Sequence, residues 1–286
     1  MKKLIINIDD LGLSKAVNDA AEKCITEGIV TETSVIPCAN AFGEAVSILK
    51  ELGNLDVGVH LSLTGKFNPC TNHSETINSL VGDDGKFYGN YQEMLMKYFL
   101  GEMKPDQINN EFKSQIEKVK RAGLRITHVD SHEHIHMLPG ISRIAMKLAK
   151  KYKIPFVRNS SEKMGVLCKD FSILKFPGYA ALKMFTPFVK KRFLSEGIKT
   201  NDSFLGHFHS GKINDDVMKH FINNLPEGIT EIAIHPCTED NEFLKTNPWH
   251  KNGPIELDVL LNGNWRDQIK SKNIQLITHR DLIADY

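Results

Sequence analysis

Short apolar runs alternate with longer amphipathic stretches along almost the whole chain, and this alternation is the strongest constraint on its fold. The first run, residues 4–8, is compact enough for a strand that is buried on both faces. Ser14 follows as a candidate helix N-cap, and apolar residues at helical spacing continue to Gly28, a typical helix stop. Repeated strand–helix units predict a parallel sheet, most simply closed as an α/β barrel. A doubly wound open sheet is the alternative.

The same alternation extends over the rest of the chain. Strands are predicted at residues 4–8, 29–36, 55–63, 125–129, 154–157, 203–208, 229–234 and 274–278. Helices are predicted at about 14–28 and at 41–52, 91–100, 105–122, 139–152, 180–194, 215–224 and 255–271, with a loop at 237–253. We therefore predict a single domain over residues 1–286, a distorted TIM-type (βα) barrel with insertions at about 65–104 and 159–200.

Composition excludes several classes of protein. Lys plus Arg number 36 against 35 Asp plus Glu, so the chain has no basic excess for nucleic acid. No run approaches the roughly 18 apolar residues of a membrane span. The N-terminal apolar run is too short for a signal peptide, which predicts a cytoplasmic protein. Five cysteines without a Cys-x-x-Cys pair argue against a disulfide framework and against a cysteine zinc site.

Polar residues gather at the predicted carboxyl ends of the strands. They are Asp9, Asp10, His60, Asp130, His132, Arg158, His207, His209 and His235. Because catalytic groups of (βα) barrels collect at this end of the strands, residues that are distant in sequence should converge in space.

The Asp9–Asp10 pair and the segment from His128 to His136 are the two densest clusters. Adjacent carboxylates favour a cation or a shared proton, although the pair could simply complement the N-terminus of the helix after Ser14. Four histidines within nine residues favour metal ligation. An extended segment would place them on one face, whereas a helical turn would pair His132 with His136.

Other polar residues have structural explanations as well. His60 and His235 each follow an apolar run, where a hydrogen-bonded core histidine is as reasonable as a ligand. Taken alone, Arg158 is most simply interpreted as a partner in a buried ion pair. Cys237 is most simply interpreted as a small residue that packs in the interior. Four more histidines are predicted at the surface: His73, His220, His250 and His279.

Taken together, these motifs resemble the YdjC-like carbohydrate deacetylases, the family that contains chitooligosaccharide deacetylases. The matching pieces are Asn7-Ile-Asp-Asp-Leu-Gly-Leu-Ser14, Gly28-Ile-Val-Thr-Glu-Thr-Ser34, Gly58-Val-His-Leu61, Thr127-His-Val-Asp-Ser-His-Glu-His-Ile-His136, Val157-Arg158 and Glu231-Ile-Ala-Ile-His-Pro236. They occur in the family's order over nearly the whole chain. Leu11 departs from the family's usual phenylalanine, a change that should affect packing only.

The resemblance implies hydrolysis of an N-acetyl group from a sugar by a water molecule that a divalent metal activates. It implies metal ligation by Asp10, His60 and His132, with His136 as an alternative to His60. Asp9 would be the general base and His235 the general acid. Asp130, His134, His136 and Arg158 would bind substrate or support the ligands. Mg²⁺ or Zn²⁺ is expected, with Co²⁺ and Ni²⁺ open, and a homodimer is implied.

Two other functions stay open at this point. One is a different barrel metal hydrolase, an amidohydrolase or a phosphoesterase. These enzymes typically carry His-x-His after the first strand, where this chain has Asp9 and Asp10. The other is a non-catalytic sugar-binding protein of the same fold.

Overall fold

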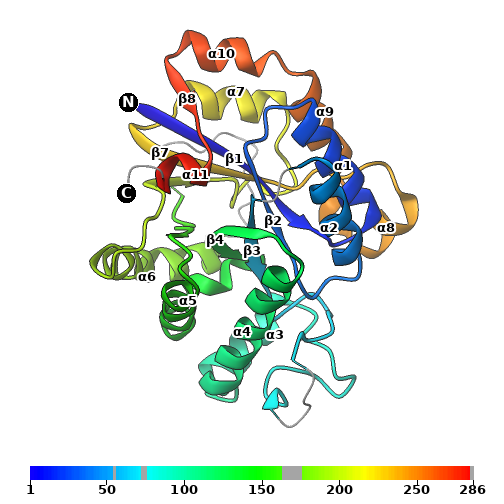
Figure 1. The fold of residues 1–286 in the computed structure, drawn as a ribbon, viewed down its shortest axis with the longest axis vertical. Helices are drawn as coiled ribbons and strands as arrows, with labels where there is room; N and C mark the ends of the chain where they lie inside the picture. The colour runs from blue at the N-terminus through cyan, green and yellow to red at the C-terminus, as the bar shows by residue number, and fades with distance from the viewer. Residues whose placement is uncertain (54–55, 72–75, 163–175, 284–286) are drawn as a thin grey trace.

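The fold is a curled parallel sheet with helices around its outside (Figure 1). The computed structural model describes residues 1–53, 56–71, 76–162 and 176–283. The strands are β1 (Lys2–Leu11), β2 (Glu32–Val35), β3 (Asp56–Leu61), β4 (Arg125–Ser131), β5 (Phe156–Val157), β6 (Ser203–Leu205), β7 (Gly228–Ile234) and β8 (Ile274–Leu276). Their order is β5-β4-β3-β2-β1-β7-β6, with β8 paired to β1. This arrangement confirms the prediction of a distorted TIM-like barrel.

β1 is the centre of the sheet because three strands pair with it. β7 pairs with β1 along most of the length of β1. β8 pairs with the first residues of β1, and β2 pairs with the last residues of β1. Leu4, Ile6 and Ile8 face the main hydrophobic core, whereas Ile5 faces a second cluster that contains Phe156. Both faces are therefore covered, which explains why this strand is a continuous apolar run instead of an alternating one.

The two edge strands approach each other through short bridges. Phe156 of β5 pairs with Lys199, and Glu162, just beyond β5, pairs with Phe204 of β6. The Glu162 carboxylate also accepts the backbone N–H of Phe208 at 3.0 Å. These contacts curl the sheet toward closure, so the carboxyl ends of the strands surround one common opening.

The helices follow the predicted alternation. They are α1 (Lys15–Thr26), α2 (Phe42–Glu51), α3 (Tyr91–Phe99), α4 (Pro105–Arg121), α5 (Pro139–Tyr152), α6 (Phe176–Ser195), α7 (Asp215–Asn223), α8 (Asn241–Thr246), α9 (Gly253–Asn262), α10 (Trp265–Ser271) and α11 (His279–Ile283). Ser14 caps α1 by accepting the N–H of Val17, as its residue type predicts. No helix in the described part of the chain is long and apolar enough to cross a membrane.

Two predictions near the C-terminus were wrong. The helix predicted at 255–271 is two helices, because Trp265 folds back and donates its Nε1–H to the carbonyl of Val259. A Cβ on Gly263 would lie only 1.7 Å from Trp265 Nε1, so the chain breaks where glycine leaves room. The segment 237–253, predicted as a loop, contains α8, whose N-cap is Asp240, and a short 3-10 turn at Pro248–His250.

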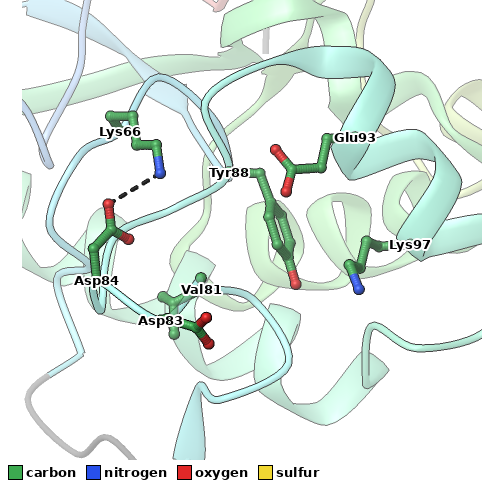
Figure 2. Close-up of a pocket in the computed structure, with 8 residues that line it drawn as sticks. Lys66, Val81, Asp83, Asp84, Tyr88, Glu93 and Lys97 are labelled. Atoms are coloured by element: carbon green, nitrogen blue, oxygen red, sulfur yellow. Dashed lines mark hydrogen bonds and ion pairs between the residues drawn. The ribbon is translucent and has the colours of Figure 1, made fainter.

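The first insertion contains the predicted short helix, α3, capped by Asn90. It also contains a hollow of about 490 Å³ (Figure 2). In its wall Lys66 pairs with Asp84 at 3.0 Å, and Lys97 pairs with Glu102 at 2.7 Å. Its cationic groups are thus already neutralised. In the second insertion, α6 is longer than predicted, and residues 163–175 lie outside the described residues.

Candidate metal centre

A bulge at the end of β1 turns two successive carboxylates into the barrel. Neighbouring residues of a regular strand point to opposite faces of the sheet. Here the register with β2 shifts between Ile8 and Leu11, and Asp10 has a φ of 64°. Bulges re-aim side chains in this way. Asp9 and Asp10 consequently both lie within reach of His60.

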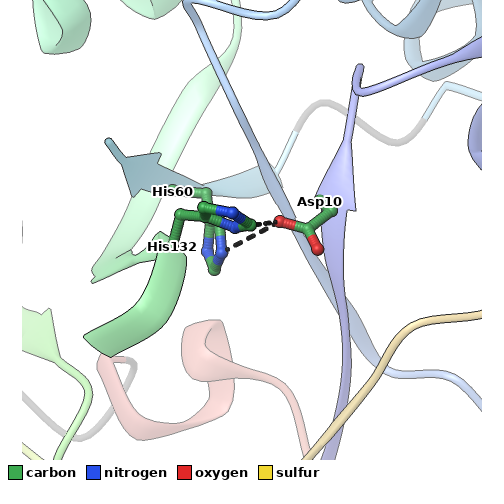
Figure 3. Close-up of side chains that lie close together, drawn as sticks. All are labelled: Asp10, His60 and His132. Carbon is green, nitrogen blue, oxygen red and sulfur yellow. Dashed lines mark hydrogen bonds and ion pairs between the residues drawn. The ribbon is translucent and has the colours of Figure 1, made fainter. Parts of the chain in front are cut away.

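Asp10, His60 and His132 converge on one point, from β1, from β3 and from the turn after β4 (Figure 3). Asp10 Oδ1 lies 2.9 Å from His132 Nδ1 and 3.3 Å from His60 Nε2. Asp10 and His60 are buried, while the His132 side chain keeps 13% of its surface exposed. One side of the group therefore stays open to solvent.

The charges in this group stabilise each other. Burial alone would raise the pKa of Asp10, but His132 and His60 hold it well below the usual range of an aspartate. Burial likewise opposes the protonation of His60, yet the surrounding carboxylates, Asp130 first, raise its pKa to about 10. Burial also opposes the protonation of His132, but the effect of the Asp10 carboxylate is larger than that of burial, so the pKa of His132 is raised. The carboxylate attracts positive charge to the point where the three side chains meet.

These residues fit a divalent cation. Two imidazole nitrogens and one carboxylate oxygen are typical ligands of zinc and related metals, and three protein ligands leave positions for water and substrate. Asp10 Oδ2 is buried and has no hydrogen-bond partner among the described residues. A buried carboxylate oxygen without a donor is costly, and a metal ion would satisfy it.

Asp130 orients His60 from behind. Its Oδ1 lies 2.9 Å from His60 Nδ1, and its Oδ2 accepts the Ser34 hydroxyl at 2.8 Å. This contact leaves His60 Nε2 directed at Asp10. A carboxylate on the far nitrogen of a metal-binding histidine fixes the ring and its tautomer.

Arg158 joins three buried carboxylates beneath the group. It makes a bidentate pair with Asp9, with both N–O distances at 2.7 Å. It also lies 2.8 Å from an oxygen of Asp130 and 2.8 Å from an oxygen of Glu231. Burial opposes its charge, but these carboxylates raise the pKa of Arg158 well above its ordinary value. The guanidinium thus fixes the Asp9 side chain.

We expect Arg158→Met to destabilise the protein strongly. Removing the guanidinium leaves buried carboxylates uncompensated, which costs about 3–5 kcal/mol in the free energy of unfolding. Urea denaturation of the metal-free proteins measures this loss. Arg158→Lys is the matched control, since it keeps the charge without the bidentate geometry and should lose less. Equal stability of Arg158→Met and wild type would contradict this role.

The turn after β4 separates the clustered histidines. Glu133 and His134 have φ of 55° and 57°, so the segment forms neither an extended strand nor a regular helix. His136 consequently points away from Asp10. Its Nδ1 lies 2.5 Å from the Ser131 hydroxyl, and its Nε2 lies 2.9 Å from the Arg158 carbonyl. Neither geometry expected from the sequence occurs, and the structure brings His60, not His136, to Asp10 and His132.

The remaining two histidines of this segment lie apart from the metal group. The His134 ring packs 5.1 Å from that of His207 and 5.2 Å from that of Phe204. His128 is fully buried, and its ring stacks on that of His279 at 3.8 Å. They support the barrel wall around the site instead of completing the group.

A second wall of the site comes from the segment after β7. His235 Nε2 lies 3.9 Å from Asp9 Oδ2, and the His235 backbone N–H donates to Glu256 at 2.8 Å. His250 Nε2 lies 3.9 Å from Asp10 Oδ2, and burial lowers the pKa of His250 to about 3. The Trp249 ring lies 5.4 Å from His235 and 5.9 Å from His132. This wall therefore contacts both aspartates.

Comparison with known proteins identifies the family of this chain. Residues 3–271 match the family of YdjC-like proteins. The chain belongs to the YdjC-like family. Proteins of Brevibacillus brevis and Thermoanaerobacter pseudethanolicus, each named a carbohydrate deacetylase, are 29% identical to it over 98% of this chain and 98–99% of their own. The crystal structure of a protein from Enterococcus faecalis superposes with a TM-score of 0.78 at 26% identity, covering 98% of each chain.

In this YdjC-like protein, two histidines predicted at the surface are buried. His250 is 1% exposed beside Asp10, and His279 is fully buried in the barrel. The His279 backbone N–H donates to the buried Glu32 at 2.6 Å, and its ring packs against those of His128 and Phe156. His250 and His235 both lie in the segment between β7 and α9. Their closeness in sequence is therefore a signal for the position of His250 near the site. His220 is partly exposed, and His73 lies outside the described residues.

Proposed function

We propose that this YdjC-like protein is a metal-dependent carbohydrate deacetylase that hydrolyses the N-acetyl group of an acetylated sugar. The observation that carries the proposal is the convergence of Asp10, His60 and His132 next to Asp9 and His235. Curated relatives named carbohydrate deacetylases align over nearly the full length of the chain. Asp9 and Asp10 in place of a His-x-His pair disfavour an amidohydrolase or phosphoesterase.

Asp10, His60 and His132 would hold the metal ion. When bound, a divalent cation polarises the acetyl carbonyl and lowers the pKa of water. Imidazole ligands favour Zn²⁺ over Mg²⁺, with Co²⁺ and Ni²⁺ as alternatives. Elemental analysis of the purified protein identifies the ion.

Asp9 is proposed to accept a proton from the attacking water. Arg158 holds both Asp9 oxygens, and an ionised carboxylate keeps further lone pairs for the incoming proton. General-base assistance of this kind typically contributes about 10²–10⁴-fold in rate. Because Arg158 fixes the Asp9 carboxylate, Asp9 can orient the attacking water as well as accept its proton.

His235 is proposed to donate a proton to the sugar nitrogen as the C–N bond breaks. Without protonation the sugar nitrogen would have to leave as an amide anion, which is a very poor leaving group, so a proton donor beside the acetyl group is required. The His235 side chain is 12% exposed and lies against Trp249. The products are acetate and the free amino sugar.

Aromatic side chains at the opening are suited to a sugar ring. Trp249 is 41% exposed, and Phe67 of the first insertion lies 6.2 Å from the His132 ring. Trp249 approaches the His132 ring from the segment after β7, and Phe67 approaches it from the first insertion. Sugars of the substrate are proposed to lie between these rings, with the acetyl group directed at Asp10.

Acetate release from a panel of N-acetylated mono- and oligosaccharides tests the proposal. Purified protein is assayed with Mg²⁺, Zn²⁺, Co²⁺ or Ni²⁺, and the metal content of the same sample is measured. We expect acetate from at least one sugar with one metal. Turnover of a sugar phosphate without acetate release would favour the phosphoesterase alternative. Sugar binding without any turnover would favour the non-catalytic alternative.

The cytoplasmic location and the homodimer remain proposals. Light scattering on purified protein tests the dimer, and fractionation of the source cells tests the location.

A further inference from the structure

A pair of thiols lies in contact between the segment after β2 and the first insertion. Cys38 follows β2 in the segment before α2, and Cys70 lies at the start of the first insertion. Their Sγ atoms are 3.2 Å apart although the residues are 32 positions apart in sequence. Cys38 is 6% exposed, whereas Cys70 is half-buried. One thiol is therefore accessible to a reagent, and its neighbour is protected.

Hydrogen bonds from α4 hold the segment that carries Cys70. Glu111 of α4, fully buried, accepts the backbone N–H of Cys70 at 2.9 Å and that of Thr71 at 3.0 Å. Gln115, one turn further along α4, bonds the backbone of Ser62 on both its N–H and its carbonyl. The segment that carries Cys70 is thus held at two points, so the contact between the sulfurs is built into the packing.

The same contacts favour sulfur–sulfur chemistry over metal binding. Glu111 Oε1 would be the third ligand of a metal at this place. It already accepts the N–H of Cys70 and the side-chain amide of Gln115, both at 2.9 Å, and the Cys38 thiol faces it at 3.6 Å. A metal would have to compete with these donors, whereas disulfide formation leaves the two N–H bonds intact.

We propose that Cys38 and Cys70 form a reversible intramolecular disulfide in exchange with a small-molecule disulfide. The Cys70 thiolate attacks one sulfur of the small disulfide, releases one small thiol and forms a mixed disulfide. The sulfur of Cys38 then attacks Cys70 Sγ, and the Cys38 proton leaves with the second small thiol that this step releases. Two protein thiols are oxidised to one disulfide, and the small disulfide is reduced to two thiols.

The bond would restrain one wall of the active site. It would link the segment after β2 to the insertion only three residues beyond Phe67, whose ring lies against His132. Closing a loop of this length restricts the unfolded chain, and we expect Tm to rise by roughly 5 °C. Oxidation is thus coupled to the stability of the insertion.

Oxidised glutathione provides the direct test on the full-length protein. Cys168, outside the described residues, is first changed to serine so that it cannot take part. Cys24 and Cys237 are both fully buried, so neither should be accessible to glutathione. We expect a Cys38–Cys70 cross-linked peptide by mass spectrometry, lost on reduction with dithiothreitol, and the higher Tm of the oxidised form.

Two single variants separate the steps of the exchange. Cys38→Ser should trap glutathione on Cys70, because the second thiol is missing, and should lose the rise in Tm. Cys24→Ala, at a buried cysteine away from the pair, should behave like its parent. A persistent glutathione adduct on Cys70 in the parent protein, or two thiols that remain open to alkylation after oxidation, would overturn the proposal. Neither readout requires deacetylase activity.

Discussion

Asp10→Asn is expected to abolish stoichiometric metal binding and to lower deacetylase activity by about 10³-fold or more, since metal assistance supplies several kcal/mol. The change removes the charge at which His60 and His132 converge. Asparagine tolerates the left-handed backbone that Asp10 adopts, so the bulge should survive. Elemental analysis and acetate release on the same sample measure both effects.

Asp19→Asn is the matched control for this variant. Asp19 lies on α1 and pairs only with the exposed Lys15 among the contacts described, so metal content and activity should match wild type. If Asp10→Asn keeps one metal per chain, the ion is held elsewhere. The buried group of Glu32, His128 and His279 would be the first place to look.

Asp9→Asn is expected to separate catalysis from metal binding. It should lower kcat by about 10²–10⁴-fold, the usual contribution of a general base. Metal content and KM should change little, because Asp9 pairs with Arg158 and is absent from the group formed by Asp10, His60 and His132. Steady-state kinetics with metal analysis provides the measurement.

The stability of the Asp9 variant is measured alongside, since the substitution removes one carboxylate from Arg158. A folded, metal-loaded Asp9→Asn protein with wild-type kcat would exclude Asp9 as the base. If the Asp10 variant is inactive in the same experiment, Asp130 or His235 would be the next candidate for the general base.

Much of the site follows from one rule about parallel sheets. Asp10, His60 and His132 are far apart in sequence, yet each lies at or just beyond the carboxyl end of a strand. Because parallel strands present these ends at one edge, the convergence of these residues could be predicted from the sequence. The helical periodicity and the N-cap Ser14 likewise locate the helices.

The rest depends on tertiary contacts that residue patterns do not encode. The left-handed conformation of Asp10, which directs both aspartates inward, arises from a local bulge against β2. The burial of His250 results from the fold of the segment 237–253, and the break after α9 results from one indole that packs over Gly263. The contact between Cys38 and Cys70 requires the insertion to return to α4.

Titration of the metal-free protein with Zn²⁺ tests the central claim most directly. Acetate release from an N-acetylated oligosaccharide is followed at each addition, with Asp10→Asn in parallel. We expect activity to rise in proportion to added metal, to level off at one ion per chain, and to stay near background in the variant. Full acetate release by metal-free protein, or no release at any ratio of Zn²⁺ or of the other divalent ions, would contradict the account.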